Sequence, residues 1–291
     1  MRALPAEEAL STTFSGQPTK NIRPPSFEPW RLWSAGRELL RYRDLVLTLS
    51  LHRINVRYKQ SILGWAWAVV QPLALMLIYT IIFSVVTKMP DEGVPYAVFV
   101  YAALLPWTYF ATIMTNSATC LVNHSQLITK VYFPREILPL TYVVAAFVDF
   151  LVGALVLAGM MVYYHLPVTA YVLYLVPIMA VLTAFGLALA LFLSVLQVRV
   201  RDIGLAMPLV IQIWMFATPV VYPLSAVPLR LRFYYDMNPL AGTIESFRRV
   251  LLQSKPPEYS SFGEAAVIAL ALLPLAYLFF KYREASMADF I

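Results

Sequence analysis

The chain has 291 residues, of which 60% are hydrophobic and only 13% are charged, and its formal net charge is +6. Soluble domains carry about 25% charged residues, so this chain has too little charge to cover a water-soluble globule, and we expect a membrane protein. No soluble basic face is large enough to predict nucleic-acid binding. With Cys120 as the single cysteine and three widely spaced histidines, neither an intrachain disulfide nor a metal site is expected.

Residues 1–29 form the first segment of the chain, which combines several prolines with Glu7 and Glu8 and contains no apolar core. A secretory signal needs such a core. The segment is therefore predicted to be a disordered tail, and we assign it no role.

Residues 30–63 are predicted to hold a cytoplasmic interfacial helix, because polar and apolar side chains recur every three or four positions between Leu40 and Lys59. One apolar strip consists of Leu40, Leu47, Leu51, Ile54 and Tyr58, and a smaller one of Leu45, Leu49 and Val56. One strip can lie in the lipid headgroup region while the other packs against protein. Gly64 permits the turn that follows, and Trp65 and Trp67 are expected to anchor the next helix at the membrane surface.

Six apolar runs are long enough to cross the hydrocarbon, which needs about 20 residues each. They cover residues 65–86, 96–119, 137–164, 168–198, 203–222 and 262–282. Basic loops alternate with neutral ones, which places both termini in the cytoplasm by the positive-inside rule. We therefore expect an all-α membrane protein with six transmembrane helices in residues 64–284 and a cytoplasmic C-terminus at 285–291.

Residues 223–262 break the charge pattern, because they hold five Lys or Arg side chains yet must lie outside. Parts of this segment, such as RLRFYYDMNPLAGTIESFRRVLL, are half apolar. We expect two short re-entrant helices joined at MNPLAG, which need surrounding protein or a water-filled cavity at membrane depth. A plain surface loop is the alternative.

Five stretches, in this order, resemble the membrane subunit of type-2 ABC transporters that export polysaccharides such as O-antigen, capsule and teichoic acid. They are RYKQSILGWAWAVVQPLALMLIYTIIFSVV, KVYFPREILPL, RDIG followed by IQIWMFATPVVYP, NPLAGTIESFRRVLL, and YREASMADFI. The resemblance implies a homodimer in the bacterial cytoplasmic (inner) membrane, with two copies of a cytoplasmic ABC ATPase subunit. It also implies three roles: residues 40–59 as a gate helix for the lipid-linked substrate, 121–133 as a coupling helix touching the ATPase, and 224–252 as an outer gate.

Aromatic residues are predicted to line the substrate conduit, because rings that stack on sugar faces hold each unit weakly and let the polymer slide. The favoured residues are Tyr79, Phe83, Trp107 and Trp214. Their placement near the dimer axis is implied by the resemblance. The alternative is that these rings pack helices together or sit in interfacial belts.

Charged residues give two further candidates. Arg53, Arg57 and Lys59 stand where a lipid diphosphate would approach from the inner leaflet, and guanidinium groups bind phosphate well; attraction to anionic membrane lipids alone is the alternative. Asp149 is the one charge that lies away from the ends of a predicted span. It marks either the conduit or a structural hydrogen bond to a neighbouring helix.

The chain contains no G-x-x-x-x-G-K-[ST] motif, so ATP and Mg are expected in a partner ATPase, with no cofactor or catalysis in this chain. The apolar knobs expected to contact that ATPase are Leu121, Leu127, Ile128 and Val131. His124, in the same segment of the chain, is expected to be a polar surface residue. One alternative is a type-2 exporter of a small lipid or drug. Another is a membrane-embedded glycosyl- or acyltransferase, which would need clustered Asp, Glu and His residues at one membrane face, and the sequence contains no such cluster.

Overall fold

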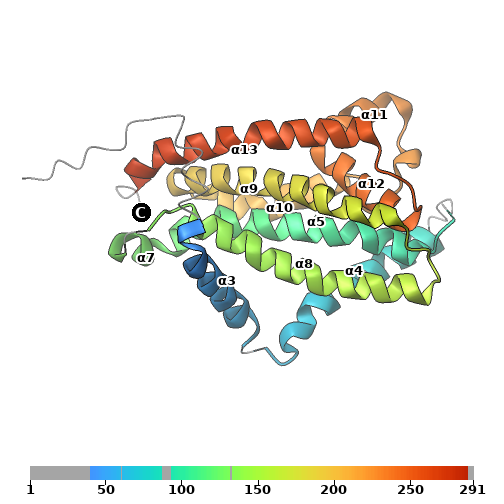
Figure 1. Cartoon of the computed structure of the whole chain (residues 1–291), viewed down its shortest axis with the longest axis horizontal. Helices are drawn as coiled ribbons and strands as arrows, with labels where there is room; N and C mark the ends of the chain where they lie inside the picture. The colour runs from blue at the N-terminus through green and yellow to red at the C-terminus, as the bar shows by residue number, and fades with distance from the viewer. Residues whose placement is uncertain (1–39, 60, 87–92, 132, 288–291) are drawn as a thin grey trace, which may run out of the picture.

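The computed structural model describes residues 40–59, 61–86, 93–131 and 133–287, and these residues form helices and connections without a strand. The predicted tail, 1–29, lies outside the described residues. The helices are α3 (Arg43–Tyr58), α4 (Trp67–Thr80), α5 (Tyr96–Ala118), α6 (Cys120–Asn123), α7 (Ser125–Lys130), α8 (Ile137–Tyr163), α9 (Leu175–Arg199), α10 (Asp202–Phe216), α11 (Leu229–Asp236), α12 (Pro239–Leu252) and α13 (Tyr259–Met287). The all-α prediction is therefore confirmed for this part of the chain (Figure 1).

Four helices are long and apolar enough to cross a membrane: Tyr96–Ala118, Ile137–Tyr163, Ala170–Arg199 and Tyr259–Glu284. Two other predicted spans are shorter apolar helices, Trp67–Phe83 and Asp202–Phe216. The 15 residues of α10 rise only about 22 Å, which is less than the hydrocarbon thickness of about 30 Å. The total of six spans thus stays a prediction.

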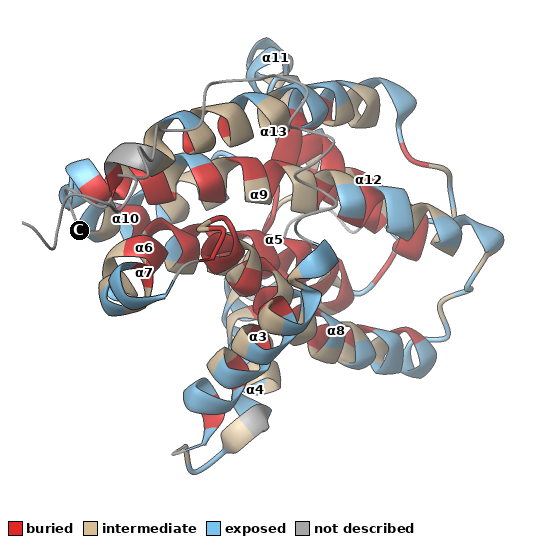
Figure 2. Cartoon of the chain, turned by 60° about the vertical axis from the view of Figure 1, so that its left-hand side comes forward, coloured by how far each residue is buried: buried red, intermediate tan, exposed pale blue. Residues whose placement is uncertain are grey.

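Helix α5 is the centre of the bundle, where it packs against α4, α8, α9, α10 and α12. It is the most buried of the four long helices, and Figure 2 shows buried residues gathered along α5, α9 and α12. Small residues permit this packing. A Cβ atom on Gly153 of α8 would lie 2.5 Å from Leu105 Cδ1, and the Tyr101 hydroxyl of α5 donates to the Gly153 carbonyl at 3.1 Å.

A second cluster of buried apolar residues joins α6 and α7 to the start of α8, the end of α9 and the end of α13. We call this the α7 end of the bundle (Figure 1). Helix α3 packs beside α8 here. Its buried side is formed by Val46, Ser50, Ile54 and Tyr58. One side of α3 thus packs on protein and another faces outward, but the two predicted strips are not those sides: Leu47 and Leu51 are exposed, whereas Ile54 and Tyr58 of the same predicted strip are buried.

The opposite end of the bundle carries α11 and α12, joined at Met237 and Asn238 within the predicted MNPLAG connection. The Asn238 side chain caps α12 by accepting from the Leu240 amide at 3.2 Å, and Pro239 occupies the first turn. Most of α12 is buried against α5, α9 and α13, so a plain surface loop does not describe it. Entry of these helices into the outer leaflet stays a prediction.

Candidate transport site

A cavity of about 570 Å³ lies between α3, α4, α5, α8 and α10. Its volume falls in the range of about 300–1,000 Å³ that small-molecule sites occupy. The polar and charged lining residues are Arg57, Tyr58, Gln71, Thr108, Thr112, Thr115, Asn116 and Asp149, and the aromatic ones include Trp67, Trp107, Tyr109 and Phe150. The cavity therefore offers hydrogen-bonding groups, ring surfaces and a cation in one place.

Two predicted site residues form an ion pair in this cavity. The Arg57 guanidinium, at the C-terminal end of α3, donates to the Asp149 carboxylate on α8. The other Asp149 oxygen accepts from the Tyr58 hydroxyl at 3.0 Å. Asp149 lies about 18 Å along the axis of α8 from its first residue, Ile137. The pair thus fixes the end of α3 beside the middle of α8. It gives Asp149 a structural contact with a neighbouring helix, while its place in a substrate conduit stays a prediction.

Three threonines of α5 follow one another along the cavity at positions 108, 112 and 115. Spacings of four and three residues place side chains on the same face of a helix. Thr108 donates to the Leu105 carbonyl at 3.0 Å, and Thr115 donates to the Ala111 carbonyl at 2.9 Å. Because these hydroxyl protons are used within the helix, their oxygen lone pairs remain as acceptors. Sequence reasoning missed this stripe, although its spacing was visible.

The structure does not bring the four predicted conduit aromatics into one cavity. Trp107 lines the cavity but is only 3% exposed and packs on Phe110, with ring centroids 6.0 Å apart. Tyr79 and Phe83 belong instead to a row of rings that continues to Tyr96 of α5. The ring centroids of Tyr79 and Phe83 lie 6.4 Å apart, and those of Phe83 and Tyr96 lie 6.3 Å apart. Helix packing, the alternative interpretation, therefore accounts for Tyr79 and Phe83.

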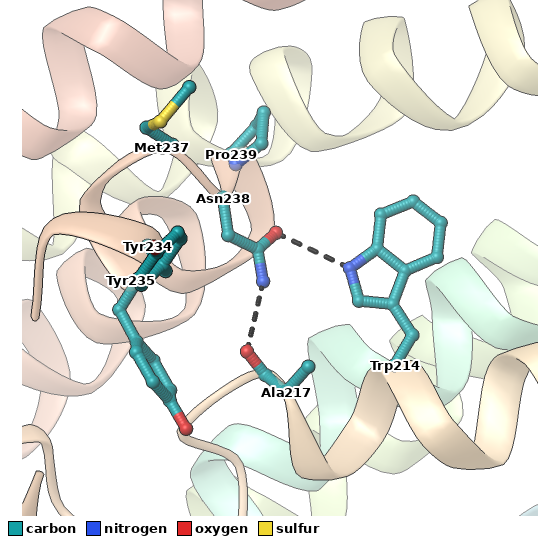
Figure 3. Close-up of a pocket in the computed structure, with 7 residues that line it drawn as sticks. All are labelled: Trp214, Ala217, Tyr234, Tyr235, Met237, Asn238 and Pro239. Carbon is teal, nitrogen blue, oxygen red and sulfur yellow. Dashed lines mark hydrogen bonds between the residues drawn. The ribbon is translucent and has the colours of Figure 1, made fainter. Parts of the chain in front are cut away.

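Trp214 lines a different pocket, of about 390 Å³, together with Ala217 and residues of the α11–α12 connection (Figure 3). Its indole N–H donates to Asn238 Oδ1 at 3.4 Å. The Asn238 amide in turn donates to the Ala217 carbonyl at 3.3 Å and to Thr218 Oγ1 at 2.9 Å. Trp214 therefore joins α10 to the start of α12, apart from the main cavity.

Arg53 and Lys59 have different environments from Arg57. The Arg53 guanidinium carbon lies 3.5 Å from the ring centroid of Tyr142 on α8. Its Nε and Nη1 atoms are buried and have no hydrogen-bond partner among the described residues. Burial lowers the pKa of Arg53. Arg53 is thus partly buried against α8, whereas Lys59 is exposed at the end of α3, and their contact with a lipid headgroup stays a prediction.

The predicted ATPase-contacting residues separate into two groups. Leu121 is fully buried and Ile128 nearly so, both within the cluster at the α7 end. They are core residues, and the prediction of exposed knobs is wrong for them. Leu127 is half-buried, and Val131 is 52% exposed. His124 is half-buried too, and burial lowers its pKa, so it is not the surface residue that the sequence predicted.

A charged cluster that sequence reasoning missed ties the start of α8 to the end of α13. The buried carboxylate of Glu136 lies 2.8 Å from the Lys281 ammonium, which also contacts Glu284 at 3.0 Å. Arg135 Nη1 donates to the Glu284 carbonyl oxygen at 2.6 Å. The sequence segments FPRE and KYRE carry these charges, but the 145-residue separation of Glu136 and Lys281 hides the contact.

Comparison with known proteins now gives the class of this protein. A family model described as ABC-2 type transporter matches residues 45–252. The chain belongs to this family of transporter membrane proteins, as the resemblance predicted.

Individual relatives agree with this assignment. The chain is 31% identical over 258 residues to the O-antigen export system permease protein RfbA of Myxococcus xanthus, covering 88% of this chain and 98% of that protein. It is 29% identical over 247 residues to RfbA of Klebsiella pneumoniae, covering 84% and 95% respectively. It is also 23% identical over 248 residues to the polysialic acid transport protein KpsM of Escherichia coli, covering 83% and 94%.

Proposed function

We propose that this chain is the permease subunit of an ATP-driven exporter that moves a lipid-linked polysaccharide across the bacterial cytoplasmic membrane. The names of its relatives, which refer to O-antigen export and polysialic acid transport, support the proposal. The observation in this chain that carries it is the composition of the main cavity, where a guanidinium, a stripe of threonine oxygens and aromatic rings lie together.

Each of these groups matches one part of a lipid-linked saccharide. Arg57 supplies N–H donors suited to a phosphate or diphosphate linkage. The threonine stripe and Gln71 offer acceptors to sugar hydroxyls, and Trp67 is exposed enough to stack on a sugar face. A small apolar lipid or drug would leave these polar groups without partners. The polysaccharide exporter is therefore favoured over that alternative.

The assembly we propose has six spans per chain, with α4 and α10 as the two short ones, and two chains per exporter. Large apolar residues on both short helices are exposed, among them Leu77 and Ile78 of α4 and Leu209 and Ile213 of α10. Gln212 of α10 is exposed beside them. An exposed amide on an apolar helix favours a protein or water-filled neighbour over lipid, which supports covering by a second copy.

In the same proposal the α7 end faces the cytoplasm and the α12 end faces outward. The basic residues Arg135, Lys281 and Arg283 all lie at the α7 end, as the positive-inside rule requires. Two ATPase subunits dock there and supply the energy, since this chain has no phosphate-binding loop. Within the α6–α7 segment, Val131 and the exposed Gln126 and Thr129 are available to contact them.

The test uses the chain co-purified with its ATPase subunit and reconstituted in lipid nanodiscs. We expect a polyprenyl-diphosphate-linked oligosaccharide to stimulate ATP hydrolysis. Arg57→Gln should raise the oligosaccharide concentration needed for half-maximal stimulation about tenfold, as loss of a charge-assisted hydrogen bond predicts. Arg43→Gln is the matched control, because Arg43 is exposed and its ion pair among the described residues is with its neighbour Asp44. Stimulation by hydrophobic drugs but by no polyprenyl-linked glycan would instead support the alternative exporter.

A further inference from the structure

Three side chains from three different elements meet at the α7 end. The Arg53 guanidinium of α3 lies over one face of the Tyr142 ring of α8, 3.5 Å from its centroid. The His124 ring, between α6 and α7, meets the same ring edge-on, with centroids 6.3 Å apart and planes at 71°. A tyrosine ring is therefore shared between α3 and the α6–α7 connection.

The Arg53 side of this contact fixes α3 on α8. Two of the Arg53 nitrogens, Nε and Nη1, are buried without a hydrogen-bond partner in the described part of the chain, so the Tyr142 ring is the main support of that side of the guanidinium. One turn earlier, the Ser50 hydroxyl lies 3.3 Å from the Thr141 carbonyl of α8. These neighbouring contacts mean that α3 cannot shift along α8 without displacing Tyr142.

The His124 side of the contact fixes the kink between two short helices. His124 ends α6 and precedes the first residue of α7. Its Nδ1 lies 2.9 Å from the Cys120 carbonyl, which can only accept, so Nδ1 carries the proton. Cys120 and Leu121 are fully buried. A displacement of the α6–α7 segment therefore moves the His124 ring against the Tyr142 ring.

We infer that Tyr142 is a positioning residue that transmits movement of the α6–α7 segment to α3, and that Arg53 and His124 are its two contacts. The inference rests on the proposed function, in which α6–α7 contacts the ATPase and α3 borders the substrate cavity. Through α3 the movement reaches Arg57 and its partner Asp149 at the cavity. The nucleotide cycle thus controls the access of α3 to α8 through one aromatic ring.

Side-chain chemistry explains why a ring suits this position. A phenyl ring offers a negative face to a cation and packs at a steep angle against a second ring, so it holds two partners in fixed directions. Tyr142→Phe keeps both surfaces and loses only the hydroxyl. Tyr142→Leu keeps an apolar side chain on α8 but removes both. Tyr163→Leu, at the exposed far end of the same helix, is the matched control.

The experiment follows α3 directly in the complete complex of permease and ATPase. An environment-sensitive dye is placed on Val56→Cys, an exposed position of α3, while the native Cys120 is fully buried and does not react. Fluorescence is compared between the nucleotide-free and the ATP–vanadate-trapped states. We expect a spectral shift in the otherwise unchanged chain, in Tyr142→Phe and in Tyr163→Leu, and a loss of that shift in Tyr142→Leu.

A mutant cycle tests the path through the ring. Arg53→Ala and His124→Ala are each expected to reduce the spectral shift. The reduction in the double variant should differ by about threefold or more from the product of the two single reductions, as for residues in one coupled network. In the Tyr142→Leu background, where the shift is already lost, neither Arg53→Ala nor His124→Ala should reduce it further. Measurements at about pH 8 keep His124 neutral, so direct charge repulsion from Arg53 does not contribute.

The outcomes of this experiment can be told apart from those of the test of the proposed function, because the dye responds to the nucleotide state of the complex and not to the glycan. A shift that persists in Tyr142→Leu overturns the inference, and so does the absence of any shift in the unchanged chain. A Tyr142-dependent shift without stimulation by any lipid-linked glycan would contradict the proposed substrate and leave the role of Tyr142 standing. Equal loss of the shift in Tyr142→Leu and Tyr163→Leu would also overturn it.

Discussion

Arg57 and Asp149 neutralise one another across 92 residues of sequence, with the guanidinium at the end of α3 and the carboxylate in the middle of α8. The Tyr58 hydroxyl adds a second hydrogen bond to the same carboxylate. A charge at membrane depth is costly unless it is paired or hydrated. Pairing therefore offsets the cost of placing these charges beside the middle of α8, and it puts a cation at the cavity without a net charge.

Replacing Asp149 with asparagine should destabilise the chain by about 2 kcal/mol, because the amide can still accept a hydrogen bond but no longer neutralises Arg57. The measurement is the shift in thermal unfolding of the detergent-solubilised protein. Asp44→Asn on α3 is the control. Within the described part of the chain Asp44 forms an exposed pair with Arg43 at 3.5 Å, so this substitution should cost less than about 1 kcal/mol. Equal stability of the two variants would contradict a structural role for the Asp149 pair.

A buried arginine forms an ion pair at the α12 end. Arg248 is 1% exposed, and its Nη2 contacts Glu245 at 2.5 Å and the Pro219 carbonyl at 2.8 Å. Its guanidinium carbon also lies 4.2 Å from the Phe99 ring centroid. Glu245→Gln should therefore cost about 3 kcal/mol, because it leaves a buried cation without a counter-charge.

A neighbouring pair, between Arg249 of α12 and Glu258 just before α13, supplies the control for this prediction. Arg249 and Glu258 lie 3.7 Å apart and are both substantially exposed, so Glu258→Gln should change the free energy of unfolding by less than about 1 kcal/mol. Both variants are compared by thermal unfolding under identical conditions. A loss in Glu245→Gln no larger than in Glu258→Gln would show that water reaches Arg248.

Most of the fold follows from the sequence because apolar runs of span length leave little choice of structure. The end of α10 does not follow in the same way. The apolar run was counted to Tyr222, but the helix stops at Phe216 and the chain turns through Thr218 and Pro219. Hydropathy cannot register this stop, since the residues after Phe216 are as apolar as those before it.

The site was harder to predict, because its geometry depends on contacts between distant segments. Arg57 and Asp149 were both selected as charges in unusual places, but nothing in the sequence indicated that they pair. Leu121 and Ile128 show the opposite error. Apolar residues of a short helix look the same whether they face a partner or the core of their own chain, and only the tertiary structure shows that these two are buried.

The pKa of His124 predicts a pH dependence of stability. Burial lowers this pKa, with a smaller contribution in the same direction from Arg53, against a hydrogen bond to the Cys120 carbonyl that raises it. The unfolded chain, with a pKa near 6.5, then binds more protons than the folded one just below that pH. Stability due to neutral His124 is present above about pH 6.5 and is lost as the pH falls through the lower, folded-state pKa.

His124→Asn tests this directly, because asparagine does not titrate. The unfolding temperature of the unchanged chain should fall more steeply between about pH 7.5 and pH 5.5 than that of His124→Asn. Other groups that titrate in this range are common to both proteins, so the difference between the two curves isolates His124. Parallel curves would contradict the buried position of its ring.

Two glycines test the packing of α12 on α13. A Cβ atom on Gly242 of α12 would lie 2.5 Å from the backbone oxygen of Ser261 on α13, whereas one on Gly159 of α8 would meet nothing within 4 Å. Backbone atoms cannot move aside as the tip of a side chain can. Gly242→Ala should therefore destabilise the chain by about 1–3 kcal/mol, while Gly159→Ala should be neutral or stabilise it through the higher helix propensity of alanine.

The two glycine variants also test whether α12 can move away from α13. If α12 rests on the start of α13 as firmly as the Gly242 contact indicates, Gly242→Ala must separate the two helices before the added methyl group can fit. It should then expose the buried Arg248, and proteolysis within residues 223–258 should become faster than in Gly159→Ala, because cleavage follows the population of the locally opened state. Equal proteolysis rates and equal unfolding temperatures would mean that α12 already stands away from α13 in solution.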